Sequence, residues 1–277
     1  MASFDNKTSL LRLGPLLDLS FSHICVATFD YHQTSVFPVN ILLALARDEG
    51  RGDDFISIPS EGRREPLLGG HVYFVPCELE VRFDITPAVS TLAFHFNLTF
   101  LHGLDVFSGS RRWEMRRDPD LAARLLALAN EGRDELKAVC ALKAEVMNFC
   151  LSRWPEGLDR LTPAARKYEP LFRHVREHGD AALTVGALAA LAGQRQDVFS
   201  RAFSRDIGKS PQEYLHSGLL KKVAARLLLP GASVKQVAAE LRFSSEFYLS
   251  RFFKKRTGLS PRDYQDKFRV PQPLTTR

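Results

Sequence analysis

The feature that most constrains this chain is a stretch of sixteen residues that occurs twice. FSRAFSRDIGKSPQEY fills positions 199–214, and the near copy LSRFFKKRTGLSPRDY fills positions 249–264. In each copy apolar residues recur at the spacing of one helix face up to a glycine, Gly208 or Gly258, and a Ser-Pro pair follows. Glycine is favoured just after a helix, and Ser followed by Pro favours the start of the next one. Each copy therefore predicts the end of one helix, a turn and the start of another.

A second pair of matching segments precedes the copies. LTVGALAAL leads into the turn AGQR, and VKQVAAEL leads into the turn RFSS, with Thr184 and Ser233 placed to cap the two helices. The chain thus predicts two helix-turn-helix units, at 184–207 and 233–257, of the kind that reads DNA. A stacked helical array is the alternative, but it needs at least three repeats. The apolar faces of the second helices are expected to hold Val198, Phe199, Ala202, Phe203 and Ile207, then Phe247, Tyr248, Leu249, Phe252 and Phe253.

The segment between the two units predicts a rod. SPQEYLHSGLLKKVAARLLLPG reads as one helix that ends at Pro230-Gly231. About 18 helical residues span about 27 Å. This length is close to the ~34 Å between successive major-groove turns on one face of B-DNA. One chain is therefore expected to read two adjacent half-sites.

Charge is unevenly distributed along the chain. Residues 1–163 carry 17 Lys and Arg against 22 Asp and Glu, and residues 164–277 carry 21 against 10, so the two parts have net charges of −5 and +11. A basic C-terminal part suits an anionic partner such as double-stranded DNA, although many chains carry basic surfaces for solubility alone.

The doubled motif resembles a known family. The pattern SRxF[SK][RK]xxGxSPx[DE]Y at both positions, with Leu188-Ala189 and Val237-Ala238 upstream, is similar to the DNA-binding domain of the AraC/XylS transcription regulators. In that family the second helix of each unit enters the major groove. The resemblance implies that bases are read by Gln196, Asp197, Ser200 and Arg201, and by Glu246, Phe247, Ser250 and Arg251. It makes Lys209 and Lys254 candidates for phosphate contact, with Arg205 and Lys255 on the same outward faces.

Three positions depart from the family pattern. Leu220 and Gln265 stand where the family usually has Arg, and they are expected to remove internal polar anchors. Arg242 stands where the family usually has Gly in the second turn. A turn that needs a positive φ penalises a residue with a Cβ by roughly 1–2 kcal/mol. Either the turn is built differently here, or Arg242 offsets that strain through a contact to DNA phosphate, and we favour the contact.

The N-terminal part reads as β structure. Short apolar runs such as HVYFV, LEVRF and TLAFHF alternate with turn-rich segments such as RDEGRGDD, which is typical of a β-sandwich or barrel. The order of these runs is similar to the cupin-like sensor half of the same family, where a barrel encloses a small effector. Arg82 and His95 are the candidate effector-binding residues, although Arg82 could equally lie on a solvated strand face.

An enzyme is the competing interpretation of a cupin-like half. His71, Glu78 and His95 fall on predicted strands, but the paired HxH with a following Glu that marks a metal-binding cupin is absent. We therefore expect no metal, no cofactor and no catalytic residue. The alternatives that stay open are a cupin-type metalloenzyme fused to a DNA-binding module, and a regulator controlled by a protein partner.

Two helices are predicted after the strands, broken at Asn130-Glu131-Gly132. In the second of them an apolar stripe recurs at i, i+3, i+4 spacing, and it either packs on the barrel or forms a homodimer interface. The stripe is Leu136, Val139, Cys140, Lys143, Val146, Met147 and Cys150. The four cysteines show no CxxC spacing and are expected to be reduced.

The expected fold is two-domain α+β. Residues 1–155 form a cupin-like β-barrel with helices that serves sensing and dimerisation, 156–166 form a linker, and 167–270 form an all-α, AraC-type DNA-binding domain. No leader peptide or membrane span is expected, because charges interrupt every apolar run, so the chain is predicted to be cytoplasmic. Its predicted partners are double-stranded DNA, RNA polymerase, a small-molecule effector and a second copy of itself.

Overall fold

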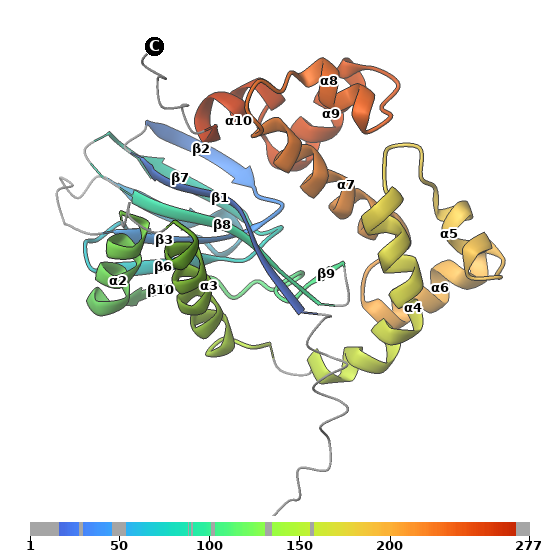
Figure 1. The fold of residues 1–277 in the computed structure, drawn as a ribbon, viewed down its shortest axis with the longest axis horizontal. Coiled ribbons are helices and arrows are strands. Elements are labelled where there is room, and N and C mark those ends of the chain that lie inside the picture. The colour runs from blue at the N-terminus through green and yellow to red at the C-terminus, as the bar shows by residue number, and fades with distance from the viewer. Residues whose placement is uncertain are drawn as a thin grey trace, which may run out of the picture. The chain divides into compact units, whose positions relative to one another are not determined.

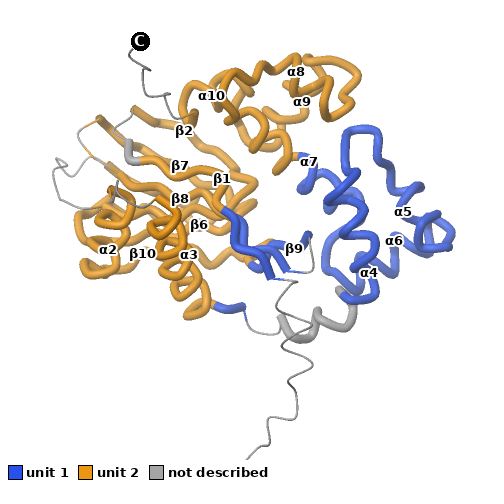
Figure 2. Tube along the Cα trace, viewed as in Figure 1, with its two compact units in different colours: residues 1–20, 97–106, 154–219 blue, residues 21–96, 107–153, 220–277 orange. Residues whose placement is uncertain are grey.

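The chain folds into two compact units in a computed structural model that describes residues 17–27, 30–45, 54–87, 89, 91–100, 103–130, 135–155 and 158–269. One unit takes its residues from 1–20, 97–106 and 154–219, and the other from 21–96, 107–153 and 220–277 (Figure 2). Strand β8 (Thr91–Phe100) and helix α7 (Pro211–Leu227) each contribute to both units. The boundaries expected at 155 and 166 stay predictions.

The described strands form two separate sheets (Figure 1). The larger has the order β1-β8-β3-β6-β10, with β9 on β8, and the smaller has the order β2-β7-β4-β5. The remaining bounds are β1 Leu17–Ala27, β2 Tyr31–Val36, β3 Asn40–Leu45, β4 Phe55–Ile58, β5 Arg63–Pro66, β6 His71–Val75, β7 Glu80–Ile85, β9 Leu104–Asp105 and β10 Glu114–Arg117; a single 3-10 turn, Pro59–Glu61, follows β4. The expectation of a closed barrel is wrong for these strands. Alternating apolar residues indicate that one face of a strand is buried. They do not indicate whether the last strand pairs with the first, which is what closes a barrel.

Alternation in the sequence explains the two faces of each sheet. Along β7 the side chains of Val81, Phe83 and Ile85 are buried, while Arg82 and Asp84 between them are only half-buried. In β3 all six side chains are buried, because both faces of this central strand are covered.

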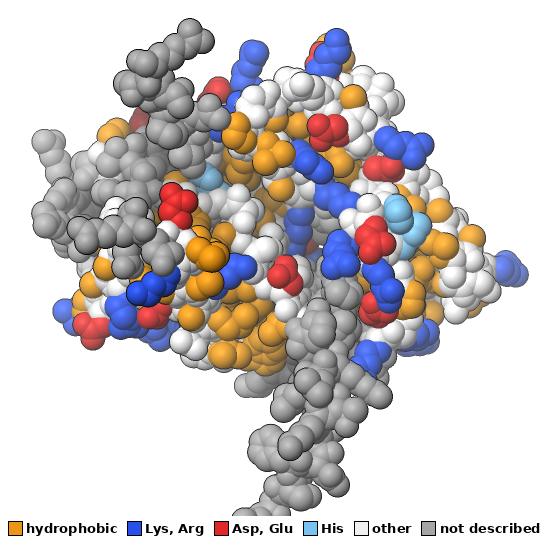
Figure 3. Space-filling model, in the orientation of Figure 1, with side chains coloured by type: hydrophobic (Ala, Val, Ile, Leu, Met, Phe, Trp, Pro, Cys, Tyr) orange, Lys and Arg blue, Asp and Glu red, His pale blue; other side chains and the backbone are white. Residues whose placement is uncertain are grey.

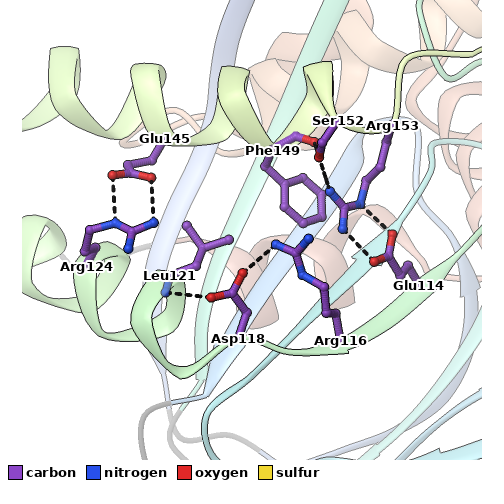
Figure 4. Close-up of polar contacts among 9 residues, drawn as sticks. All are labelled: Glu114, Arg116, Asp118, Leu121, Arg124, Glu145, Phe149, Ser152 and Arg153. Carbon is purple, nitrogen blue, oxygen red and sulfur yellow. Dashed lines mark hydrogen bonds and ion pairs between the residues drawn. The ribbon is translucent and has the colours of Figure 1, made fainter.

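Two helices, α2 (Pro119–Ala129) and α3 (Glu135–Leu151), cover the outer face of the larger sheet. The ring of Phe149 from α3 lies 5.7 Å from that of Phe74 in β6. Ion pairs reinforce this packing and the edge of the sheet (Figure 4). They join Arg153 to Glu114, Arg116 to Asp118 and Arg124 to Glu145.

The C-terminal part is helical. Its elements are α4 (Leu158–His178), α5 (Val185–Leu191), α6 (Gln196–Ile207), α7, α8 (Val234–Glu240), α9 (Glu246–Thr257) and α10 (Pro261–Phe268). Helix α4 begins inside the segment expected to be a linker, so that segment is helical from residue 158 onward. None of the described helices is both long and apolar enough to cross a membrane.

Two polar side chains, one in α10 and one directly after it, bind the end of helix α7 and the turn that follows it. Gln265 donates from Nε2 to the carbonyls of Leu227 and Ala232, each at 2.9 Å. Arg269 donates from Nη2 to the same two carbonyls, at 2.9 and 2.8 Å. The expectation that Gln265 removes an internal anchor is therefore wrong, since it is itself an anchor. Leu220 is buried and contributes apolar packing at its own position.

Candidate nucleic-acid interface and sensor pocket

The first helix-turn-helix unit is built as its sequence predicts. The Thr184 hydroxyl accepts a hydrogen bond from the Ala187 amide at 3.2 Å and so caps α5. Helix α6 ends at Gly208, whose φ of 79° is the left-handed conformation that glycine adopts without strain. Its buried side chains are Phe199, Phe203 and Ile207.

The second unit repeats this construction with different caps. Ser233 and Gln236 form a capping box at the start of α8, and Ser245 caps α9 by accepting from the Tyr248 amide at 3.2 Å. Gly258 ends α9 with a φ of 79°. The buried side chains of α9 are Leu249, Phe253 and Thr257.

The turns of the two units share their backbone hydrogen bonds but not their residues. Gly193 donates to the Ala190 carbonyl at 3.0 Å in the first turn, and Arg242 donates to the Ala239 carbonyl at 3.1 Å in the second. Gly193 has a φ of 65° and Arg242 a φ of 54°. The predicted positive φ at Arg242 is confirmed, so this residue carries the strain that Gly193 avoids.

The second helices present a polar face to solvent. The residues predicted to contact DNA that are exposed are Gln196, Asp197, Arg201 and Arg205 on α6, Arg242 in the turn, and Glu246, Phe247, Arg251, Lys254 and Lys255 on α9; Ser200, Ser250 and Lys209 are half-buried. Val198, Phe247 and Tyr248 were expected on the apolar faces, but they are 44%, 75% and 53% exposed. The buried residues of each helix recur at i, i+4 and i+8 and so form a narrow stripe. The residues directly before the start of this stripe, Val198 on α6 and Tyr248 on α9, therefore face outward.

One difference between the two exposed faces lies one turn before the matching arginines. On α6 the Arg201 guanidinium lies 3.3 Å from the Asp197 carboxylate, one turn earlier in the helix. On α9 the position one turn before Arg251 is Phe247, which is 75% exposed. Asp197 and Phe247 occupy matching places in the doubled sequence, so only the first copy has an acidic side chain there.

Sequence reasoning missed the attachment of α6 to α4. Asp206 accepts from Lys167 Nζ at 3.0 Å and from the Tyr168 hydroxyl at 2.9 Å. The hydrogen bond from Lys167 is the main reason why the pKa of Asp206 falls to about 2. Arg256 stands at the matching place in α9, so the repeat gives no signal of this contact.

An apolar pocket lies between the two sheets. Its cavity of about 20 Å³ has room for about one water molecule. Phe268, at the end of α10, lies with its ring 6.0 Å from Tyr31, 5.7 Å from Phe37 and 5.5 Å from His95. The lining residues are Cys25, Tyr31, Phe37, Ile41, Leu43, Phe83, Ile85, Ala93, His95 and Phe268.

His95 is the main polar group of this pocket. It is 3% exposed, and its Nδ1 has no hydrogen-bond partner among the described residues. Burial, which is the larger cause, and the neighbouring His23 together lower the pKa of His95 to about 3. The imidazole is therefore neutral near pH 7 and offers one nitrogen to a molecule that enters the pocket.

The second helix-turn-helix unit touches strand β2 near this pocket. Gln33 donates from Nε2 to the Gly258 carbonyl at 3.3 Å, and the Lys267 ammonium lies 4.7 Å from the ring centre of Tyr31. A Cβ on Gly258 would come within 3.0 Å of the Thr34 carbonyl oxygen. Gly258 is thus required both by its φ and by the close approach of β2.

The structure does not bring the two predicted effector residues together. Arg82 lies on the outer face of the smaller sheet, where its guanidinium pairs with Asp84 at 2.7 Å, whereas His95 faces the pocket. Arg82 lines a separate open surface pocket with His32, Ser57, Arg64 and Asp84. Within the described ranges no group of three or more His, Cys, Asp or Glu side chains is placed to hold a metal ion.

Comparisons with known proteins agree with this arrangement. A family model described as a helix-turn-helix domain matches residues 188–267. The HTH-type transcriptional regulator YobQ of Bacillus subtilis is 24% identical over 211 residues, which cover 76% of this chain and 82% of YobQ. The HTH-type transcriptional activator Btr of the same organism is 28% identical over 238 residues, which cover 79% of this chain but 43% of Btr. A crystal structure of ToxT from Vibrio cholerae matches with a TM-score of 0.58 at 11% identity, covering 91% of this chain and 98% of ToxT.

Two helix-turn-helix units, each with a solvent-facing second helix, define a DNA-binding protein of the helix-turn-helix class. The chain is similar to helix-turn-helix transcription regulators of the AraC/XylS type, and its fold is similar to that of ToxT.

Proposed function

We propose that the chain regulates transcription by placing α6 and α9 in successive major grooves of double-stranded DNA. The observation that carries this proposal is the pair of exposed faces on these helices, which hold Arg201 and Arg251 at matching places above a buried apolar stripe. Arginine reads guanine through a bidentate contact to O6 and N7, and surrounding Lys and Arg meet phosphates.

Binding-site selection from a random duplex library with the full chain tests this proposal. The selected site should contain two half-sites about 10 base pairs apart. If about six basic side chains meet phosphates, log K should fall against log salt with a slope of about −5. Binding that selects no sequence, or that is insensitive to salt, would contradict the proposal.

An effector site in the pocket between the sheets is the second part of the proposal. The lining is mostly apolar, and His95 brings to it a buried Nδ1 that has no hydrogen-bond partner among the described residues. A matching effector would be a small apolar molecule with one polar group for this nitrogen. ToxT, which shares the fold, has been crystallised with an unsaturated fatty acid and with a naphthalenyl butenoic acid. The cavity of about 20 Å³ is large enough for about one water molecule. It can therefore hold such an effector only if the Phe268 side chain moves out.

Thermal unfolding with an unsaturated fatty acid as the probe tests this part. A ligand that binds only the folded state adds ~2.7 kcal/mol at 100 times its Kd. The wild-type chain should show the shift, and His95→Leu should reduce it. A shift that is unchanged in His95→Leu would place the ligand elsewhere, and no shift with any apolar acid would favour control by a protein partner.

We further propose that the chain acts as a homodimer that contacts RNA polymerase. The first half of α3 exposes Leu136 at 76% and Val139 at 39%, and hydrophobic side chains gather over α3 on the face that Figure 3 shows.

The contact with RNA polymerase would serve activation. Btr is described as an activator, which supports the proposal that this chain also activates transcription. Transcription with purified polymerase from a promoter carrying the selected site would test the contact.

A further inference from the structure

An aromatic side chain on α9 has no structural reason to be there. Phe247 is 75% exposed, whereas the buried side chains of α9 are Leu249, Phe253 and Thr257. The matching residue of α6 is Asp197, so the fold of the unit does not need a ring at this place. An exposed aromatic ring that does not pack is a candidate for contact with a ligand.

The neighbours of Phe247 indicate what that ligand is. Phe247, Ser250, Arg251 and Lys254 follow one another at i, i+3, i+4 and i+7, and therefore lie along one face of α9. Arg251 and Lys254 are exposed cations, which suit a polyanion better than an apolar protein surface. In helix-turn-helix proteins the N-terminal residues of the second helix contact base edges, and Phe247 is in the first turn of α9.

The major groove contains one apolar group that identifies a base. This group is the C5-methyl of thymine, and Phe is among the side chains that contact it. We propose that Phe247 reads the methyl group of a thymine in the half-site bound by α9, an inference that rests on the proposed function. Asp197 cannot make this contact, because a carboxylate accepts hydrogen bonds and is poorly placed against a methyl group. The two half-sites must therefore differ at matching positions.

The position of this thymine follows from helix geometry. Phe247 and Arg251 are four residues apart, which is about 6 Å along the helix axis. The thymine should thus lie within about two base pairs of the position at which Arg251→Ala relaxes sequence preference. The Asp197–Arg201 ion pair has no counterpart at these two positions of α9, so Arg251 approaches its base without a carboxylate one turn before it.

Replacement of thymine by deoxyuridine tests the proposal. Uracil pairs with adenine as thymine does but lacks the methyl group, so each thymine of the selected site is replaced singly and its affinity for the full chain is measured. Removal of one buried methyl group should weaken binding about fourfold. One thymine in the α9 half-site should show this loss with the wild-type chain, and the same replacement should have no effect with Phe247→Ala.

The controls separate this contact from general DNA binding. Tyr248→Ala removes a neighbouring exposed ring that lies 6.0 Å from Phe243, and it should keep the fourfold preference for thymine over uracil. Phe247→Leu should keep part of the preference. The proposal is overturned if no thymine shows the loss, or if the loss persists in Phe247→Ala, while sequence-selective binding itself is intact. A wild-type chain that selects no site at all refutes the proposed function as well. If Phe247 bound a protein partner instead, Phe247→Ala would bind DNA as tightly as the wild type does. It would also show the same preference between thymine and uracil as the wild type.

Discussion

The rings of Phe268 and His95 lie 5.5 Å apart, centre to centre, inside the pocket between the sheets. Phe268 belongs to α10, which follows the second helix proposed to read DNA, whereas His95 belongs to a strand of the larger sheet. One aromatic side chain therefore connects the reading unit to the pocket proposed for the effector. An effector that enters must displace Phe268, and with it the end of α10.

Removal of the Phe268 ring should loosen this connection. Phe268 is 5% exposed, and loss of a buried Phe ring costs about 3–5 kcal/mol. Phe268→Ala should therefore lower the thermal midpoint and increase the fluorescence of an apolar dye at temperatures below it. Phe247→Ala removes the same ring from an exposed place and should change neither quantity. An equal response of the two variants would show that Phe268 does not fill the pocket in solution.

The buried His95 should make stability depend on pH. Its pKa is lowered to about 3 by burial, while the unfolded chain binds the proton near 6.5, so stability is complete above pH 6.5 and is lost as the pH falls. Between pH 7 and pH 5 the loss from His95 should be about 2 kcal/mol. His95→Gln should remove this part of the pH dependence in urea unfolding. His178→Gln, at an exposed site, should retain it, and the lowered pKa of His23 adds a remainder of the same sign.

Arg242 should stabilise the complex with DNA at the expense of the free chain. The positive φ of Arg242 destabilises the folded chain by roughly 1–2 kcal/mol. A glycine would remove this strain, but its greater freedom in the unfolded state would offset part of the gain in stability. Arg242→Gly should thus raise the unfolding free energy by about 0.5–1 kcal/mol and reduce the salt slope of DNA binding by about one. Gly193→Arg is the reverse change at the matching turn, where an added Cβ meets nothing within 4 Å, and it should destabilise through φ alone. Unaltered DNA affinity in Arg242→Gly would leave the strain unexplained.

The exposed half of α3 should hold two chains together. Val139 is 39% exposed, whereas Val146 of the same stripe is fully buried in its own unit. A charge at Val139 would be buried only when a partner covers it, at a cost of several kcal/mol. Val139→Glu should therefore sediment as a folded monomer. Asn148→Glu, which adds the same charge at an exposed position of α3 outside the stripe, shows whether charge alone is responsible.

The two arginines of the doubled motif should act at separate base positions. Arg201→Ala and Arg251→Ala should each cost about 1–3 kcal/mol at the selected site and relax preference at one position, with the two positions about 10 base pairs apart. The Arg201 variant should lose less, because Asp197 already occupies that guanidinium in the free chain. Lys254→Ala should weaken all sequences alike. Loss at one shared position would refute reading of successive grooves.

Local signals in the sequence predicted the helical part well. The caps Thr184 and Ser233, the glycines that end α6 and α9, and the strained turn at Arg242 each depend on residues within one or two turns. Such short-range preferences are visible in a single sequence. The exposure of Val198 and Tyr248 was missed, because apolar character does not show on which side of a narrow buried stripe a residue falls.

Contacts between distant segments were beyond local signals. The larger sheet places β8 between β1 and β3, and nothing in the alternating runs selects those neighbours over a closed ring of strands. The same holds for Arg269, which shares two carbonyls with Gln265, and for Phe268, whose pocket is made by strands far earlier in the chain. Arg82 and His95 were both predicted to bind an effector, but Arg82 lies on the outer face of the smaller sheet, whereas His95 lies in β8 of the larger sheet and faces the pocket.

The difference between Asp197 and Phe247 gives the bound chain a direction. With two identical reading helices, a regulator could shift along the DNA by one half-site and still meet the same groups with one of them. With an acid on one helix and an aromatic ring on the other, only one register satisfies both half-sites. A single chain then marks the upstream and downstream ends of its site, so that inverting the site on the DNA would turn the same surface of the protein away from the promoter.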